Sequence, residues 1–414
     1  MESNQIVIIG GGHAAAQLCA GLVEAGQGAR VHLVCEEACE PYHRPPLSKA
    51  FLKNAEEVAQ PHKAAQWYRD AGITLHLGDA AISIDRAART VQLRSGAALP
   101  YERLVLATGT RARQLPGLST GSLRNVISLR AAGEAQRLRT ALAAARHVTV
   151  LGGGFIGLEV AATAQGLGKT VRVLEVAPRL LGRAVSPALS AHVLAVHRAA
   201  GIDVVLGARI GAFEIEGDRL ASIEVDGAPQ PVDLLLLGIG AVPETALAEA
   251  AGIACADGIV VDAHMQTDDP AVLAIGDCTR FPDRRAGRAL RLESVQNAND
   301  QARTALATLT GTPAPHDALP WFWSEQGALR LQMAGLMPAE GTAGLESVRR
   351  PGPGASNSGA FSLFHYVDAQ LVCVESANAP LDHMMSRKLL DAGCSPAPAK
   401  VVDPAVPLKS LLSV

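Results

Sequence analysis

The chain has 414 residues, of which 48% are hydrophobic and 19% are charged, and its formal net charge is −3. This length is too great for one ordinary hydrophobic core, and this composition excludes wholesale disorder. The lack of a basic excess argues against nucleic-acid binding. No apolar stretch approaches the roughly 20 residues that a membrane helix needs. Glu2 stands where a secretory signal would be basic, so we expect a cytoplasmic protein.

One pattern occurs twice along the chain. Residues 6–36 and 148–175 each contain a short apolar run, a glycine cluster, a stretch of small residues and a second apolar run that ends in glutamate. The first apolar runs are Ile6–Ile9 and Val148–Leu151. This order predicts a βαβ unit in each segment, with the glycines in the turn between strand and helix.

Three positions in each glycine loop fit a dinucleotide-binding turn. They permit the tight turn, the close approach of the backbone to a pyrophosphate, and the close packing of helix on strand. In that order they are Gly10, Gly12 and Ala15 in the first loop, and Gly152, Gly154 and Gly157 in the second. The helix N-terminus then offers free N–H groups and partial positive charge to phosphates. A single glycine loop is a weak signal, but two in the same context predict two dinucleotides, with bound FAD and exchanging NAD(P)H as the natural pair.

The glutamate that closes each unit is placed to accept hydrogen bonds from an adenosine ribose. These residues are Glu36 and Glu175. A carboxylate at Glu175 would bond a 2′-hydroxyl and repel a 2′-phosphate, which favours NADH over NADPH. Arg179 and Arg183 follow nearby and would soften that preference.

The segment Pro41–Lys49, PYHRPPLSK, resembles the signature of FAD-dependent NADH:ferredoxin reductases of bacterial oxygenase systems, the putidaredoxin reductase and biphenyl-dioxygenase reductase type. The resemblance covers nearly the whole chain. It continues through residues 107–109, 152–159, 267–277, 293–295, 321–324 (WFWS) and 406–409. The PPLSK and WFWS segments are the specific ones, since glycine loops also occur in other flavoproteins with two dinucleotides.

The resemblance implies an α/β, glutathione-reductase-like fold with two Rossmann-type domains and a C-terminal α+β domain. The FAD-binding domain would be discontinuous, over residues 1–112 and 243–318. The NADH-binding domain, residues 113–242, would be inserted in it, and residues 319–414 would form the C-terminal domain and cover the flavin.

The resemblance also implies two sets of contact residues. Those for FAD are Gly10, Gly12, His13, Ala14, Ala15, Glu36, Lys49, Ile82, Thr108, Gly109, Arg130, Asp277 and Val295. Those for NADH are Gly152, Gly154, Phe155, Ile156, Gly157, Glu159, Glu175, Arg183 and Gly240. Relatives usually carry glycine where this chain has Ala15, and His13 is also unusual there. Alanine is tolerated at that position.

Three further features have both a functional and a structural interpretation. Lys49 and Glu159 would meet beside flavin N5 as a catalytic pair, or be a surface lysine and a helix charge. Asp277 would accept a ribitol hydroxyl, or cap a helix. Trp321 and Trp323 would form an aromatic wall beside the flavin, with Trp323 the preferred residue, or pack in a core. In a strand, Phe322 would lie on the opposite face.

The implied reaction passes electrons from NADH through FAD to a [2Fe–2S] ferredoxin, which supplies an oxygenase (a cytochrome P450 or a Rieske dioxygenase). An NADH:rubredoxin reductase or an NADH oxidase on the same fold is the alternative enzyme. A non-catalytic redox-sensing protein of the apoptosis-inducing-factor type is the alternative from another class. The sequence predicts no nucleic-acid or membrane partner, and it leaves the oligomeric state open.

Cysteines and histidines give no site from their spacing. The chain has seven scattered cysteines, which predict free thiols in a reducing compartment. Cys35 and Cys39 lie near the adenosine end of the predicted FAD site, which is the wrong end for a redox dithiol. The 12 histidines are dispersed, His62 and His383 are interpreted as surface residues, and no metal site is predicted.

Overall fold

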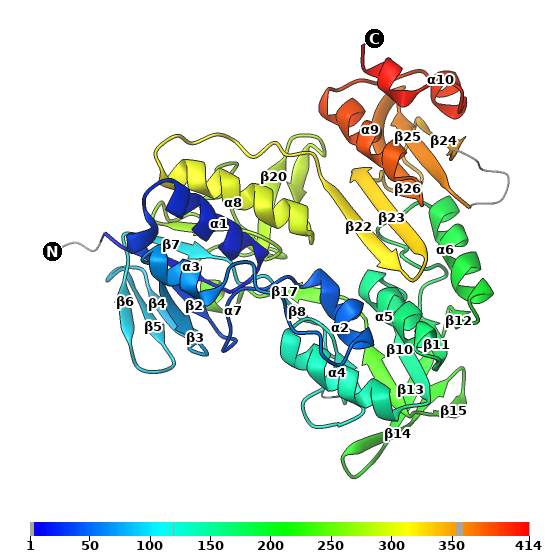
Figure 1. Ribbon diagram of the computed structural model, residues 1–414, viewed down its shortest axis with the longest axis horizontal. Helices are drawn as coiled ribbons and strands as arrows, with labels where there is room; N and C mark the ends of the chain where they lie inside the picture. Colours follow the sequence, from blue (N-terminus) through cyan, green and yellow to red (C-terminus); the bar gives the residue numbers. More distant parts are fainter. Residues whose placement is uncertain (1–3, 119, 353–358, 414) are drawn as a thin grey trace. The chain divides into compact units, whose positions relative to one another are not determined.

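The computed structural model describes residues 4–118, 120–352 and 359–413, and it divides into two compact units. Unit 1 contains Met1–His43, Ala59–Arg111 and Ala241–Ala318. Unit 2 contains Arg44–Val58, Ala112–Gly240 and Leu319–Val414. Each unit is therefore assembled from three separate stretches of chain, as the colours in Figure 1 show.

Unit 1 is built on a parallel sheet of five strands in the order β19–β7–β1–β2–β3. The strands are β1 (Ile6–Ile9), β2 (Val31–Cys35), β3 (Thr74–Leu77), β7 (Arg103–Leu106) and β19 (Val272–Ala274). All of β1 is buried, as expected for a parallel strand that is covered on both faces. Because β2 pairs with one edge of β1 and β7 with the other, the carboxyl end of β1 is a switch point, where dinucleotides bind.

Helices α1 (His13–Glu24) and α8 (Val295–Leu309) pack against each other in unit 1, and Figure 1 draws them in blue and yellow. A Cβ atom on Gly21 would lie 2.5 Å from Cδ2 of Leu306, so the missing side chain permits this close approach. The small residues of α1 thus serve helix packing as well as the turn that precedes it.

Smaller elements complete unit 1. One antiparallel sheet contains β4 (Ala81–Asp85), β5 (Thr90–Leu93) and β6 (Ala98–Pro100). Strand β18 (Ile259–Val260) pairs in parallel with β20 (Thr279–Asp283), which pairs with β21 (Arg288–Leu290). Strand β8 (Thr110–Ala112) pairs with β17 (Ala241–Pro243). The helices are η1 (Gly28–Arg30), α3 (Ala65–Asp70) and α7 (Ala246–Ala250).

Unit 2 repeats the parallel arrangement with the strand order β12–β11–β10–β16–β9. The strands are β9 (Val126–Ser128), β10 (His147–Leu151), β11 (Thr170–Glu175), β12 (Asp203–Leu206) and β16 (Leu234–Leu237). The helices of this part are η2 (Pro45–Ser48), α2 (Ala50–Lys53), α4 (Ala132–Ala144), α5 (Phe155–Gly166) and α6 (Pro187–Ala199). A three-stranded sheet is formed by β13 (Ile210–Glu216), β14 (Arg219–Val225) and β15 (Ala228–Pro231). Two dinucleotide-type folds are thereby confirmed.

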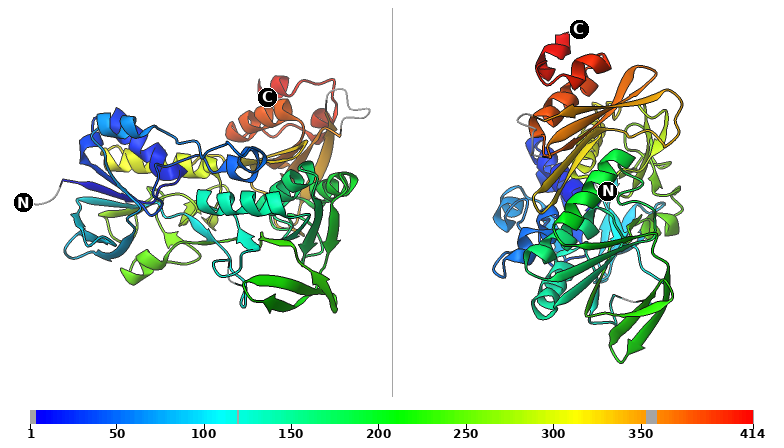
Figure 2. Two further views of the ribbon diagram at one scale, coloured as in Figure 1. Left: turned by 60° about the horizontal axis from the view of Figure 1, so that its bottom comes forward. Right: turned by 90° about the vertical axis from the view of Figure 1, so that its right-hand side faces the viewer.

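The last part of unit 2 is an antiparallel sheet with the order β22–β23–β26–β25–β24. Its strands are β22 (Trp321–Gln326), β23 (Leu329–Gly335), β24 (Leu345–Pro351), β25 (Phe361–Val367) and β26 (Gln370–Ala377). Helices α9 (Pro380–Asp391) and α10 (Pro398–Val402), orange to red in Figure 2, pack on this sheet, and η3 (Leu408–Ser413) packs on α9. The buried Arg350 donates hydrogen bonds to the carbonyls of Val401, Asp403 and Val406 at 2.8, 2.7 and 3.1 Å, which attaches the C-terminal segment to β24.

Residues 44–58, which we placed in the FAD-binding domain, pack in unit 2. The structure corrects the expectation that His62 and His383 are surface residues. His383 is buried, with 3% of its surface exposed, because α9 turns it toward the antiparallel sheet, and His62 is half-buried. The seven cysteines are all among the described residues and all are free thiols, as expected. No described helix has the length and the apolar character needed to cross a membrane.

Candidate active site

The first glycine loop joins β1 to α1 at the switch point of unit 1. Gly10 has φ +117°, and a Cβ atom there would lie 2.2 Å from the carbonyl oxygen of Ala107, so only glycine fits. A Cβ atom on Gly12 would meet no atom within 4 Å, so the loop presents open space at this position. Gly12 also has no side chain to cap the N–H groups of the first turn of α1. The loop therefore fits a diphosphate group, which such a turn binds through its backbone.

The second loop joins β10 to α5 in unit 2 with the same geometry. Gly152 has φ +109°, and a Cβ atom there would lie 2.4 Å from the carbonyl oxygen of Gly238. A Cβ atom on Gly157 would lie 2.5 Å from the carbonyl oxygen of Gly152. A side chain at this position would therefore clash with the loop where α5 packs on its strand, so glycine is required there. Ala15 fills the corresponding place in the first unit and is completely buried, so the extra methyl group is accommodated there.

The acids at the ends of the second strands differ between the two units, because Glu175 is the last residue of β11 and Glu36 follows β2. The Glu175 carboxylate accepts hydrogen bonds from the backbone N–H groups of Gly153 (2.6 Å) and Ala177 (2.7 Å). The backbone N–H of Gly152 donates to Leu174, and that of Gly10 donates to Val34, so the residue equivalent to Glu175 is Cys35. Glu36 lies one residue further along; it is exposed and paired with Arg94 at 3.2 Å. The sequence repeat alone did not indicate this one-residue offset.

Several residues that we expected to contact FAD lie around the carboxyl edge of the unit 1 sheet. Thr108 and Gly109 follow β7, Asp277 follows β19, and Val295 begins α8. A Cβ atom on Gly276 would lie 3.3 Å from Cβ of Ala14, which places the residue before Asp277 against the first turn of α1. Ile82, on β4, is 55% exposed. The other two candidates, Lys49 and Arg130, are in unit 2.

Lys49 and Glu159 form a buried ion pair in unit 2. The Nζ atom of Lys49 lies 2.6 Å from Oε2 of Glu159, and the two side chains are 19% and 5% exposed. The same Oε2 atom accepts a hydrogen bond from Ser48 (2.6 Å), and Oε1 accepts one from Ser324 (2.8 Å). Lys49 also donates to the carbonyl oxygen of Pro45 at 3.1 Å. Burial of the charged pair is thus compensated by a full set of hydrogen bonds.

Comparison with known proteins agrees with this arrangement. Residues 4–302 match the family model described as pyridine nucleotide-disulphide oxidoreductase, and residues 321–412 match the model described as reductase C-terminal. The chain is 40% identical to rhodocoxin reductase of Rhodococcus erythropolis, over 98% of this chain and 93% of that protein. It is 36% identical to putidaredoxin reductase of Pseudomonas putida, over 99% of this chain and 97% of that protein.

A crystal structure of a ferredoxin reductase from Rhodopseudomonas palustris superimposes with a TM-score of 0.91 at 41% identity, and covers 98% of this chain and 99% of its own. The chain belongs to the ferredoxin reductases. It is an oxidoreductase of the flavoprotein type, and the family's cofactors are FAD and NAD. The resemblance first seen in PYHRPPLSK is thereby confirmed.

In this ferredoxin reductase, strand β22 carries the tryptophans of the WFWS segment. The rings of Trp321 and Trp323 stack with their centroids 5.7 Å apart, and the ring of Phe322 lies 5.0 Å, centroid to centroid, from that of Phe155. Strand alternation therefore places Phe322 on the face opposite to the two tryptophans, as expected. The Arg387 guanidinium lies over the ring of Trp321, with its Cζ atom 4.0 Å from the ring centroid. Trp321 therefore has packing partners, and Trp323 remains the better candidate for the aromatic wall.

The remaining NADH candidates lie along the carboxyl edge of the unit 2 sheet. Phe155 begins α5, and Ile156 is 46% exposed. A Cβ atom on Gly240 would lie 3.7 Å from Nη2 of Arg183, so these two predicted residues are neighbours. Ser48 and Ser324 were missed as site residues. Ser48 lies in the PPLSK segment and Ser324 in the WFWS segment. Their membership of these two specific segments was the sequence signal that could have identified them.

Proposed function

We propose that this enzyme passes electrons from NADH through FAD to a [2Fe–2S] ferredoxin that supplies an oxygenase. The full-length match to relatives named for small electron carriers, rhodocoxin, terpredoxin and putidaredoxin reductases at 36–40% identity, carries this proposal. A solved structure that matches this chain with a TM-score of 0.92 is a covalent complex of putidaredoxin reductase with putidaredoxin. FAD, when bound, would take up electrons as a hydride pair and release them singly.

We assign the diphosphate of FAD to the Gly10–Ala15 loop and its ribitol to Asp277. Thr108, Gly109 and Val295 would complete this site, and the family resemblance adds Lys49, Arg130, Glu36 and Ile82 as further FAD contacts. The open space beside Gly12 and the position of Gly276 against Ala14 support this assignment. We propose residues 1–112 and 243–318 as the FAD-binding domain, as inferred from the sequence; the stretch 44–58 within them, which carries Lys49, packs in unit 2.

We assign NADH to the Gly152–Gly157 loop in residues 113–242. The Glu175 carboxylate, oriented by two backbone N–H groups, would accept hydrogen bonds from the ribose hydroxyls. Its negative charge would repel the 2′-phosphate of NADPH. Arg183 and Gly240 would bound the same site.

In this proposal Lys49 supplies positive charge where the flavin becomes negative, and Glu159 holds the ammonium group in place. Ser48 and Ser324 act through Glu159 as positioning residues, because each donates a hydrogen bond to one of its carboxylate oxygens. Preorganised charge of this kind needs no rearrangement when the reaction occurs. Residues 319–414, which contain Trp323, would form the third domain and contribute the aromatic wall.

Steady-state turnover with NADH and three acceptors tests the function. We expect a [2Fe–2S] ferredoxin to be reduced faster than a rubredoxin or dioxygen. A higher rate with rubredoxin or dioxygen would favour the alternative enzymes, and no turnover would favour a redox-sensing protein. Free thiols in all seven cysteines are consistent with the reducing cytoplasm in which we place the enzyme.

A further inference from the structure

Three histidines from separate parts of the sequence meet in unit 1. They are His13, His43 and His62, and one ring nitrogen of each lies within 4.8 Å of those of the others. The ring centroids are 3.9 Å apart for His43 and His62, 4.6 Å for His13 and His62, and 5.8 Å for His13 and His43. The rings are mutually tilted by 52° to 82°, so they surround a common space rather than stacking on one another.

The backbone holds two of these histidines as a pair. Tyr42 and Pro61 form an antiparallel bridge, and hydrogen bonds flank it from His43 N–H to Gln60 (2.9 Å) and from His62 N–H to Pro41 (2.8 Å). Side chains alternate along bridged segments. Tyr42 is buried on one side, so His43 and His62 are directed to the other.

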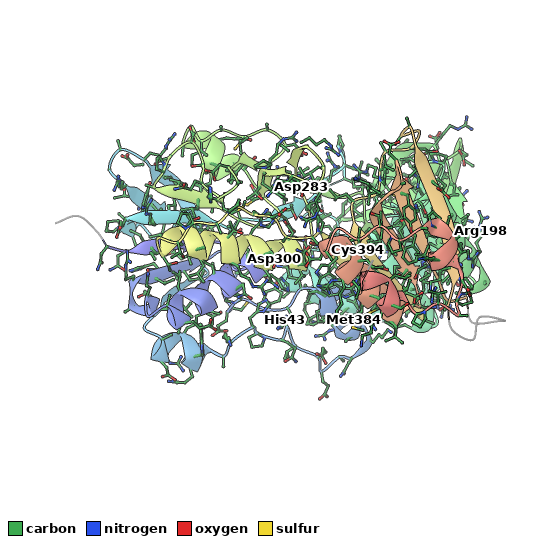
Figure 3. The ribbon with its side chains drawn as sticks, turned by 90° about the horizontal axis from the view of Figure 1, so that it is seen from above. His43, Arg198, Asp283, Asp300, Met384 and Cys394 are labelled. Atoms are coloured by element: carbon green, nitrogen blue, oxygen red, sulfur yellow. The ribbon has the colours of Figure 1, made fainter. Side chains whose placement is uncertain are left out.

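The third histidine comes from a helix. His13 is the first residue of α1 and follows directly on the Gly10–Gly12 loop. Two bridged segments and the start of a helix therefore present their imidazoles to one point. His13 and His62 are half-buried, and His43, which Figure 3 labels, is exposed, so an ion can reach the group from solvent.

We propose that His13, His43 and His62 bind a divalent transition-metal ion. Imidazole nitrogen suits zinc, copper, nickel and iron, whereas calcium and magnesium require oxygen ligands. Zinc bound tetrahedrally at about 2.0–2.1 Å would bring its nitrogen ligands to roughly 3.4 Å from one another. Small rotations of the exposed His43 ring and of its neighbours would close the remaining gap. Three protein ligands leave the fourth position to water.

The ion would fasten the Tyr42–Pro61 bridge to the first turn of α1. The positive end of that helix opposes a cation, so a nearby anion is needed for tight binding. A diphosphate held by the Gly10–Gly12 loop, as in the proposed function, would supply this negative charge. The FAD-loaded protein is therefore the form in which the metal site should be measured.

Isothermal titration calorimetry with Zn²⁺, on FAD-loaded protein that has been freed of metal by chelation and dialysis, tests this site. We expect one zinc ion per chain at the histidine site. His62→Ala and His43→Ala should each weaken this binding on the order of tenfold or more, which is the scale even for loss of an outer-shell partner. The control is His147→Ala, which removes an exposed histidine in unit 2 and should leave zinc binding unchanged.

Two further measurements separate metal binding from folding and from flavin binding. His62→Phe keeps an aromatic ring in place but removes both nitrogens, and it should lose zinc as His62→Ala does. The FAD content of His62→Phe, and its melting temperature without zinc, should match those of the wild type. Zinc affinity that is unchanged in the histidine variants, or equally weakened in His147→Ala, would overturn the proposal. So would the lack of saturable zinc binding in wild-type protein that carries FAD.

Discussion

Oε2 of Glu159 accepts hydrogen bonds from both Lys49 and its neighbour Ser48, each at 2.6 Å, in an interior where Glu159 is only 5% exposed. Two donors from the PPLSK segment thus converge on one oxygen, while Ser324 of the WFWS segment bonds the other. The two most specific sequence segments of this chain are therefore joined through a single carboxylate on α5. This relationship brings residues of both segments to one buried ion pair.

Glu159→Gln should destabilise the protein, because the amide group leaves the Lys49 ammonium without its counter-ion. We expect a loss of about 1–3 kcal/mol in the free energy of unfolding, less than for a fully buried pair since Lys49 is 19% exposed. Urea denaturation measures this change. Glu325→Gln is the control, because its pair with Arg330 at 3.7 Å is about half exposed and should contribute under about 1 kcal/mol. Equal effects of the two substitutions would contradict the special position of Glu159.

Glu175→Ala should relax the preference for NADH over NADPH. The substitution removes both a hydrogen-bond acceptor for ribose and a charge that repels the 2′-phosphate, so the ratio of kcat/KM values should shift by about 1–3 kcal/mol. Steady-state kinetics with each nucleotide measures it. Glu216→Ala, at an exposed position on β13, should leave the ratio unchanged. A wild-type enzyme that already prefers NADPH would show that Glu175 is wrongly assigned.

Asp277→Ala should lower the FAD content of the purified protein, which we expect to be yellow with non-covalently bound flavin. Loss of a hydrogen bond donated to a carboxylate costs about 1.5–3 kcal/mol, or roughly tenfold to 100-fold in affinity. The ratio of flavin absorbance to protein absorbance, followed by titration with FAD, measures the effect. If wild-type protein stays colourless after reconstitution, the FAD assignment itself is wrong.

Trp323→Ala should slow the reduction of ferredoxin more than the reduction of the enzyme by NADH. The expectation follows from its place beside Trp321 on β22, on the face opposite to the Phe322–Phe155 contact. Stopped-flow absorbance resolves the two phases. Equal slowing of both phases would make Trp323 a packing residue, and an unchanged ferredoxin phase would remove it from electron transfer.

His383→Gln should flatten the dependence of stability on pH below neutrality. Burial, reinforced by Arg387 and Arg330, lowers the pKa of His383 from 6.5 to about 4. The unfolded chain therefore binds more protons between pH 6.5 and about 4, and the folded protein loses stability as the pH falls through that window. This shift corresponds to up to about 3 kcal/mol.

Thermal unfolding of wild type and His383→Gln at several pH values measures this loss. Their difference in free energy of unfolding should change in favour of the variant as the pH falls. The exposed His147→Gln should run parallel to the wild type. Parallel curves for His383→Gln and wild type would mean that His383 titrates normally in the folded protein.

The sequence by itself determined the two dinucleotide-binding turns. Gly10, Gly152 and Gly157 are recognisable because their requirements are local, involving a positive φ or a close approach to backbone within one βαβ unit. The alternation of Trp321, Phe322 and Trp323 was equally predictable, since it depends only on strand geometry. The Lys49–Glu159 pair was predicted through the family resemblance and was found as an ion pair.

Only the tertiary structure decided which distant residues meet. Ser48 and Ser324 approach Glu159 across separations of 111 and 165 residues, and His13, His43 and His62 come together from three separate backbone elements. The burial of His383 and the alignment of Cys35 with Glu175 were likewise invisible in the sequence. Periodicity and turn chemistry act over a few residues, whereas these contacts depend on how whole elements pack, which no local pattern encodes.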